Sequence, residues 1–492
     1  DIFWDRFGGI KKWHGRLERD YYKTGYVTGH SGYRRRAPVS YNERINCVDT
    51  ATECLTEFGW RKVGRIKSGM KIYTKNPKTG KIELDTVIKV NKGKYKGPAH
   101  VMRGRISSVT TPNHRWLVDR FIDHGLRNGG RELRVGFVSS SELPHGISTS
   151  NKRIHLTGDP VVQCGGKWFD YEVELIGWIL TDGCYVSRVL KKTKCINRGV
   201  HIVQSNRANP DKVVKIDKLF ENFTDTISPF REAPVLPFRR KDYGRGAVSW
   251  IMHNKLTNKI YEALPDKTLT SEFLSELSTI QLRLLYETML LGDGSWDKQV
   301  GAYRSFTAGT KQRADMFSML CVLLGIPHKL FAVAPIETRK KYKSVNGQII
   351  KSKLCWCVRL KRRHRAQPAW HSSWVYFSGE MWCPTTKNGT FIARRNNVVY
   401  VTGNSPIQAD EAKIVLDAMT RLSKIDHDLL QASMEIHDDL TFIWPRRRVD
   451  ELAGIVIPEM LTTPLEWAQV TPIVVEMAVG DDWASQKGAG IF

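Results

Sequence analysis

The middle of the chain is organised around two similar stretches, LIGWILTDG at residues 175–183 and YETMLLGDG at residues 286–294. Each pattern predicts an apolar helix with small residues on one face, closed by Asp-Gly. Small residues let helix backbones approach closely, so we expect the two helices to pack side by side about a pseudo-twofold axis. The closing glycines, Gly183 and Gly294, can take the left-handed conformation that caps a helix.

This packing would bring two carboxylates together. Asp182 and Asp293 end the two helices, beside the negative ends of both helix dipoles. Carboxylates in such a place repel each other, and a divalent cation relieves the repulsion. The resulting metal site would suit the hydrolysis of phosphodiesters, because the metal activates water and neutralises the leaving oxygen. One copy alone would more simply be a core helix with a glycine cap, but the second copy favours the metal site.

The chain of 492 residues is basic, with 76 Lys and Arg against 50 Asp and Glu and a formal net charge of +26. The excess lies on residues 47–404, because residues 405–492 are acidic overall. A large positive charge on one segment favours a polyanionic partner, most commonly nucleic acid. A merely soluble basic surface is the plainer alternative.

The sequence argues against membrane and secreted proteins. No apolar run approaches the roughly 20 residues that cross a bilayer, and residues 1–8 lack the order of a secretion signal. The nine cysteines are odd in number and form no C-x2-C pair, so we expect reduced thiols in a cytoplasmic protein with no membrane partner. A phage protein made in a bacterial host fits the same expectation.

The two helical stretches resemble the signature motifs of the LAGLIDADG homing endonucleases, with Thr288 at a position where the motif has glycine. The resemblance implies an α/β endonuclease domain at residues 166–370 that acts as a monomer on double-stranded DNA. It also implies that Asp182 and Asp293 bind Mg²⁺ and catalyse cleavage. The alternative is a decayed domain that only binds DNA or RNA.

A strand pattern near the end of that region supports the same interpretation. Basic and small residues alternate with apolar ones over residues 353–361, which predicts a β-ribbon with one basic face for a DNA major groove. Residues 200–207 carry a weaker version of the pattern. We therefore expect the DNA-binding residues to include Lys353, Arg359, Lys361 and Arg207.

The sequence on either side of this region predicts β structure. Residues 47–162 contain short strand patterns separated by Gly, Pro and Asn, such as a hairpin at residues 71–84. Residues 390–402 predict a second hairpin around the two-residue turn Asn396-Asn397. A β layer split by a mixed region, and itself enclosed by helical patterns at residues 7–22 and 407–422, suggests nested insertions in surface loops.

The edges of the β layer carry groups that could move an acyl chain and release the insert. Cys47 supplies a thiol at one edge, Asn404 an amide at the other, and Ser405 a hydroxyl just beyond. With the Thr-x-x-His motif of Thr111 and His114, these residues resemble an intein. The resemblance implies an all-β Hint-type horseshoe domain in two parts, residues 47–165 and 371–404.

The intein resemblance assigns a role to each group. Thr111 and His114 polarise the peptide bond before Cys47 and protonate its departing nitrogen. Asn404 attacks its own carbonyl through its side-chain nitrogen and forms a succinimide, provided that the fold holds the two groups together. Ser405 accepts the first flank as an ester, which rearranges to a peptide bond with Asn46. Splicing needs no cofactor, and cleavage of the flanks without ligation is the alternative outcome.

The sequence leaves two routes open for the first attack. Gly403 stands where inteins usually have His, and the triplet Trp116, Cys383 and Thr402 resembles the signature of class 3 inteins. In that subgroup the internal Cys383 attacks the upstream bond directly. Cys47 is also present, so an N-to-S shift at Cys47 remains the other route. A plainer interpretation makes Cys383 a buried packing thiol.

The flanks, residues 1–46 and 405–492, resemble the α+β palm and fingers of a family A DNA polymerase. His437-Asp438-Asp439 lies between apolar strand patterns, and the resemblance implies that Asp438 binds Mg²⁺ in the spliced host, whose partner is a DNA primer-template. The first metal-binding Asp motif of such a polymerase is not in the chain, so we expect no polymerisation by these residues alone. The expected endonuclease target is the uninterrupted polymerase gene.

Overall fold

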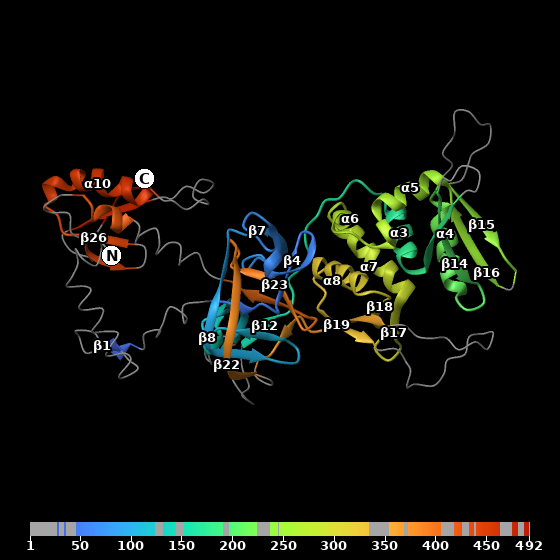
Figure 1. Cartoon of the computed structure of the whole chain (residues 1–492), viewed down its shortest axis with the longest axis horizontal. Helices are drawn as coiled ribbons and strands as arrows, with labels where there is room; N and C mark the ends of the chain where they lie inside the picture. Colours follow the sequence, from blue (N-terminus) through green and yellow to red (C-terminus); the bar gives the residue numbers. More distant parts are fainter. Residues whose placement is uncertain are drawn as a thin grey trace. The chain divides into compact units, whose positions relative to one another are not determined.

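The computed structural model describes residues 27–28, 34–35, 46–123, 131–143, 152–189, 196–223, 237–244, 246–333, 354–368, 372–404, 418–425, 432–436, 439–462, 475–480 and 487–491. The chain forms two compact units, Asn46–Asn404 and a second one made of Asp1–Ile45 with Ser405–Phe492 (Figure 1). The architecture is mixed α/β with antiparallel sheets. Within the described ranges, no helix is long and apolar enough to span a lipid bilayer.

The unit Asn46–Asn404 contains a β region assembled from the two ends of its sequence. Its strands are β3 Val48–Asp49, β4 Glu53–Thr56, β5 Gly59–Lys62, β6 Lys71–Lys75, β7 Ile82–Thr86, β8 Lys89–Met102, β9 Ser108–Thr110, β10 Arg115–Asp123, β11 Arg131–Ser139, β12 Lys152–His155, β21 Arg365–Ala366, β22 Ser372–Thr385, β23 Thr390–Arg395 and β24 Val398–Gly403. Strands β22, β3, β9 and β8 close into a barrel. Strand β22 comes from the far end of the sequence, so the barrel draws the two ends together.

Both predicted hairpins are present. Strands β6 and β7 pair across the turn at residues 76–80, and β23 pairs with β24 along its whole length. Asn396 and Asn397 form the turn of the second hairpin with φ of 47° and 62°. Asn tolerates this left-handed conformation, which a two-residue hairpin turn requires at both positions. Strand β23 also pairs with β4, at Ala393 and Cys54.

An α/β region, residues 156–364, is inserted between β12 and β21, which pair with each other at Ile154↔Ala366 and His155↔Arg365. Its elements are α3 Asp170–Asp182, β13 Gly183–Val189, β14 Ile196–Ser205, α4 Pro210–Glu221, β15 Phe238–Asp242, β16 Ala247–Met252, α5 Asn254–Ala263, α6 Ser271–Ser275, α7 Thr279–Asp293, β17 Gly294–Asp297, β18 Ala302–Ala308, α8 Lys311–Leu323, β19 His328–Val333 and β20 Cys355–Leu360. A helix, two strands and a helix occur in the same order twice, as the repeated motif predicts.

Each half of the α/β region has its own antiparallel sheet. The strand orders are β13-β14-β16-β15 in the first half and β17-β18-β20-β19 in the second. Strand β20 was predicted to belong to a β-ribbon, but it lies inside the second sheet because β18 and β19 pair with its two edges. The second sheet continues into the β region through the pair Lys329↔Val398.

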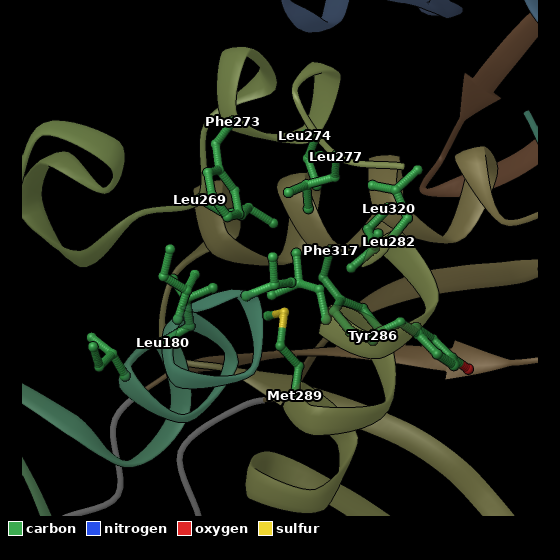
Figure 2. Packing of buried hydrophobic residues seen from close by; sticks show 14 of the residues in the cluster. Leu180, Leu269, Phe273, Leu274, Leu277, Leu282, Tyr286, Met289, Phe317 and Leu320 are labelled. Atoms are coloured by element: carbon green, nitrogen blue, oxygen red, sulfur yellow. The ribbon is translucent and has the colours of Figure 1, made fainter. Parts of the chain in front are cut away.

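Helices α3 and α7 pack against each other, as predicted, in the core of the α/β region. Figure 2 shows Leu180 of α3 and Met289 of α7 among the packed side chains of this core. A Cβ atom on Gly177 would lie 2.7 Å from Cβ of Thr288, and one on Gly292 would collide with Thr181. Each glycine therefore leaves room for a threonine side chain of the other helix. Thr288, which stands where the motif has glycine, fills the space beside Gly177.

The predicted left-handed caps are wrong. Gly183 has φ −80° and Gly294 has φ −83°, both in the extended region. The small side chain is needed for another reason: a Cβ on Gly183 would lie 2.5 Å from the carbonyl oxygen of Ile179, and one on Gly294 would collide with that of Leu290. The chain thus turns directly from each helix into a strand.

The second unit is described in short segments. Its strands pair as β1 Val27–Thr28 with β2 Arg34–Arg35, β25 Ala432–Ile436 with β26 Asp439–Phe442, and β27 Glu476–Val479 with β28 Lys487–Ile491, and helix α10 spans Val449–Leu461. The strands predicted around His437-Asp438-Asp439 are present, with Ile436 opposite Asp439. His437, Asp438 and the helical pattern at residues 7–22 lie outside the described residues.

Candidate active sites

The two ends of the unit Asn46–Asn404 meet at a hydrogen bond. Nδ2 of Asn46 donates to the backbone oxygen of Asn404 at 3.0 Å, across 358 positions of sequence. Oδ1 of Asn46 accepts from the backbone N–H of Arg115 at 3.1 Å. Both asparagines are buried. The predicted site residues Cys47 and Asn404 therefore lie at one place, held there by β3 and β24.

Thr111 holds the backbone of Cys47. The Cys47 N–H donates to Oγ1 of Thr111 at 3.1 Å, and the Thr111 N–H donates to the Cys47 carbonyl at 3.1 Å. The nitrogen that would leave in the predicted first step is thus in contact with the predicted threonine. Burial, with the nearby Cys383, raises the pKa of the Cys47 thiol well above its usual value, so the resting sulfur is protonated.

His114 is a buried, neutral histidine. Burial, together with the charges of His100 and Arg115, lowers its pKa to about 3. Its Nε2 lies 2.5 Å from Oγ1 of Thr402, and its ring meets Trp116 edge-on at 5.2 Å between centroids. Its Nδ1 has no hydrogen-bond partner in the described part of the chain. The structure thus brings three predicted residues together, with Thr402 and Trp116 orienting the imidazole.

Cys383 lies beside Cys47. The register Trp382↔Val48 and Met381↔Asp49 between β22 and β3 brings the next residue, Cys383, level with Cys47, and both side chains are buried. Burial lowers the pKa of the Arg115 guanidinium. The Cys383 sulfur opposes this shift, because it lies near enough to interact with the cation. A nearby cation stabilises a thiolate. Arg115 is such a cation beside Cys383.

Asn404 is fixed at its side chain and its backbone. Nδ2 donates to Oγ1 of Thr386 at 2.9 Å and to the Thr390 carbonyl at 3.4 Å, while its N–H donates to the Gly389 carbonyl at 3.0 Å. Oδ1 has no partner within the described residues. The predicted nucleophile and its own carbonyl are therefore both held in position. Ser405 lies outside the described residues.

The glycine before Asn404 has a structural cause. A Cβ on Gly403 would collide with the backbone carbonyl of Arg115, because β24 and the start of β10 lie close together there. The histidine that inteins usually have at this position would therefore require a backbone shift. The departure seen in the sequence follows from this close approach.

The second site lies at the ends of α3 and α7, where Asp182 and Asp293 interact. Burial and the Asp182 charge raise the pKa of Asp293, and Lys212, Lys267 and Arg313 oppose that rise. Asp182 is 19% exposed and forms an ion pair with Lys212. The predicted juxtaposition of two carboxylates is present, and it is surrounded by cations.

Two lysines at this site were missed by the sequence analysis. Lys212 Nζ lies 3.3 Å from Oδ2 of Asp182 and donates to the Gly292 carbonyl at 2.7 Å. Lys267 Nζ donates to the carbonyls of Thr181 at 3.1 Å and Gly183 at 2.5 Å. Lys267 has a left-handed φ of 56°, which for a side-chain-bearing residue is a strain that persists only where the surroundings impose it.

A signal for one lysine was present. Lys212 is the third residue of α4, and Arg313 is the third residue of α8, the equivalent helix of the second half. An alignment of the two halves that extends past the motif would therefore have matched Lys212 with Arg313. Lys267 follows α5, and its role depends on a loop conformation that the sequence does not reveal.

The donor atoms of this site fit Mg²⁺. Two carboxylates and the carbonyls at the helix ends are hard oxygen donors, and the ammonium groups that lie on them show that the place attracts cations. In the described ranges no group of three or more His, Cys, Asp or Glu could hold a metal ion. Asp182 and Asp293 would therefore share the ion with water and substrate phosphate, as is common for Mg²⁺.

The predicted DNA-binding residues have different surroundings. Arg359 is exposed on β20 and its guanidinium lies 5.0 Å from the Phe331 ring centroid, and Arg207 is exposed in the turn after β14. Lys361 is partly buried and donates to the Arg105 carbonyl at 3.4 Å, and burial with the charges of Lys329 and Arg105 lowers its pKa to about 8. Its ammonium is engaged by the β region. Lys353 lies outside the described residues.

Solved LAGLIDADG homing endonucleases are similar in structure to part of the chain. Mesophilic variants of I-DmoI share 12% identity over 39% of this chain and 89% of that chain, with a TM-score of 0.26. I-DmoI with DNA and Ca shares 14% over 39% and 84% (TM-score 0.24), and I-SmaMI bound to cleaved DNA shares 11% over 40% and 79% (TM-score 0.22). No family model and no curated protein matches the sequence. At these TM-scores the likeness carries no residue-level argument.

Proposed function

We propose that residues 47–404 excise themselves as an intein and join Asn46 to Ser405. The observation that carries this proposal is the 3.0 Å hydrogen bond between Asn46 and Asn404, which holds the two bonds to be broken at one place. A splicing reaction requires this proximity, since the acyl group must pass from one end of the insert to the other.

In the first step a cysteine sulfur attacks the Asn46 carbonyl. The C–S bond forms, the bond to the Cys47 nitrogen breaks, and that nitrogen needs a proton. A neutral His114 that accepts from Thr402 at Nε2 carries its hydrogen on Nδ1, which can be given to the departing nitrogen. Thr111 holds that nitrogen through Oγ1. The thiol proton passes to the emptied nitrogen of His114, so the imidazole ends the step neutral and the proton count balances.

The attack by Cys383 is the favoured route. The Arg115 cation interacts with Cys383, whereas the pKa of Cys47 is raised by burial and by Cys383. In the second step Ser405 Oγ attacks the thioester and the cysteine thiol leaves. Asn404 Nδ2 then attacks its own carbonyl carbon, the bond to the Ser405 nitrogen breaks, and the ester rearranges to the peptide Asn46-Ser405.

Separate variants test the route. Cys383→Ala should abolish splicing and give no ligated product, while Cys47→Ala should still splice. Asn404→Ala should stop the reaction at a branched intermediate with two amino termini. Full splicing by Cys383→Ala would exclude the Cys383 route, and full splicing by Asn404→Ala would exclude the proposed release step.

A second function, DNA cleavage with Mg²⁺, is supported by the paired Asp182 and Asp293. Bound Mg²⁺ would activate water and neutralise the leaving oxygen. Lys212 and Lys267 would hold phosphate oxygens or a water beside the carboxylates, and Arg359 and Arg207 would contact the duplex. A decayed DNA- or RNA-binding module remains the alternative function.

The endonuclease proposal is tested on a duplex that carries the uninterrupted host sequence around the insertion point. Asp182→Asn should lose nicking with Mg²⁺ and keep binding. Asp217→Asn is a matched control, because this carboxylate of α4 pairs with Arg240 at the surface. Wild-type protein that binds this duplex but leaves it uncut would favour the binding module.

The flanks form the third part of the proposal, a fragment of a family A DNA polymerase. The support is the hairpin β25–β26, which brackets His437-Asp438, the expected place of a metal-binding acid. The spliced host would bind a primer-template, and Asp438 would hold Mg²⁺. Incorporation of dNTP by the 492-residue chain alone would contradict the expectation that the fragment is inactive.

A further inference from the structure

We infer that the side chain of Asn46, the last residue of the first flank, is a catalytic hydrogen-bond donor for the release of the second flank. This inference rests on the proposed splicing function. It gives the first flank a chemical role in the cleavage at Asn404, beyond being the group that is transferred.

The orientation of the Asn46 amide follows from its two neighbours. The Arg115 backbone N–H can only donate, so the atom that it meets at 3.1 Å must be the oxygen of the amide. The Asn404 backbone oxygen can only accept, so the atom that it meets at 3.0 Å must be the nitrogen. If the amide were flipped, its nitrogen would face the Arg115 N–H and its oxygen would face the Asn404 oxygen, so neither pair could form a hydrogen bond. The buried side chain is therefore a donor aimed at the Asn404 carbonyl.

This carbonyl is the electrophile of the release step. When Nδ2 of Asn404 attacks its carbon, negative charge gathers on the oxygen that Asn46 contacts. A preorganised donor stabilises such charge more than it stabilises the neutral ground state. The tetrahedral intermediate then collapses, the bond to the Ser405 nitrogen breaks, and the proton lost from Nδ2 balances the one gained by that nitrogen.

The surroundings of Asn404 explain why such a donor is needed. The histidine that assists release in most inteins is replaced by Gly403, and a larger residue there would collide with the Arg115 carbonyl. The same residue, Arg115, uses its N–H to orient Asn46. The carbonyl of Arg115 therefore excludes a histidine at position 403, and the N–H of Arg115 positions the Asn46 donor.

The donor also couples the two ends of the reaction. Asn46 lies beside the Asn404 carbonyl only while the first flank is attached at the site or near it. A chain whose first flank has been removed should release its second flank more slowly. The rate at which the second flank is released thus depends on the presence of the first one.

The test measures release alone, in a chain with Cys47→Ala and Cys383→Ala, where neither route of the first step can operate. Asn46→Asp is an informative change, since it keeps an oxygen for the Arg115 N–H, removes the donor and places a carboxylate beside the Asn404 oxygen. We expect the rate of Asn404–Ser405 cleavage, followed by mass and by succinimide formation, to fall about 100-fold, the usual effect of losing one such donor. Asn46→Ala should fall to a similar extent.

Asn91→Asp is the matched control, because this amide donates to Thr385 in the same barrel at 3.1 Å, and its strand partner Cys383 is already alanine in the test chain. It should release the second flank at the parental rate. In the chain with both cysteines, Asn46→Asp should let the branched intermediate accumulate. Equal release rates for Asn46, Asn46→Asp and Asn46→Ala would overturn the inference while leaving splicing intact, whereas a native chain that forms no spliced product would overturn the proposed function itself.

Discussion

Single residues of the proposed splicing site lie together in the structure, as their predicted roles require. Thr111, His114 and Thr402 were placed by resemblance, and each makes a contact that serves the proposed role. The role of Asn46 was not foreseen, because a flank residue belongs to no motif and its contact spans 358 positions. Gly403 was seen as a departure, but its cause, the carbonyl of Arg115, lies on another strand.

Gly403→Ala should destabilise the β region. Its Cβ would meet the Arg115 carbonyl, and overpacking of this kind costs about 1–3 kcal/mol. Urea unfolding of a chain blocked at both steps, with Cys47→Ala, Cys383→Ala and Asn404→Ala, measures this cost. Gly93→Ala is the control, because a Cβ there meets nothing within 4 Å. Equal midpoints for the two alanine variants would mean that the close approach at Gly403 is absent in solution.

Helices and strands were predicted better than their partners. The hairpin β23–β24 follows from the local turn Asn396-Asn397, and α3 and α7 follow from apolar patterns closed by Asp-Gly. The place of β20 inside a sheet was missed, because β18 and β19 reach it from other parts of the sequence. Local chemistry specifies an element, and long-range pairing specifies its neighbours.

The contact between α3 and α7 gives a prediction for a pair of residues. Gly177→Ala should destabilise the α/β region by about 1–3 kcal/mol, because its Cβ would lie 2.7 Å from that of Thr288. Adding Thr288→Gly should relieve the clash, so the two changes should be coupled by at least 0.5 kcal/mol. Thermal unfolding of the single and double variants measures this coupling. Additive effects would show that the two residues do not meet.

At the scale of the whole molecule, the joint between the β region and its insert carries a buried charge cluster. Lys75 Nζ lies 2.6 Å from Nδ1 of His155, whose Nε2 lies 2.5 Å from Oδ1 of Asp119, and Arg365 donates to Oδ2 of Asp119 at 2.6 Å. Strands β12 and β21 contribute His155 and Arg365. The sequence predicted an insertion over residues 166–370, while these strands place the joint at His155 and Arg365.

Buried histidines predict a loss of stability in acid. Burial is the main cause that lowers the pKa of His114 to about 3 and those of His155 and His328 to about 4. An unfolded histidine binds its proton near pH 6.5, so below that pH the unfolded chain holds more protons. Stability should therefore fall between about pH 6.5 and 4, by about 1.4 kcal/mol per pH unit for each histidine.

Urea midpoints of the chain with Cys47→Ala, Cys383→Ala and Asn404→Ala at pH 7, 6 and 5 measure this slope, and His328→Gln should reduce the slope by the contribution of one proton. Asp119 affects the stability of the chain in a lower pH range. Burial would raise its pKa, but the hydrogen bonds from His155 and Arg365 outweigh it and lower the pKa to about 2. Its stabilising effect is present above about pH 4 and is lost only as the pH falls toward 2. A midpoint that stays constant from pH 7 to 5 would contradict the buried, neutral histidines.

The central claim is that the ends of residues 47–404 meet in order to react. The most direct measurement is the mass of the protein recovered after expression of the 492-residue chain. The account predicts an excised product that begins at Cys47 and ends in the succinimide formed from Asn404, together with a ligated product in which Asn46 precedes Ser405. A single chain of 56.2 kDa that persists through prolonged incubation would contradict it.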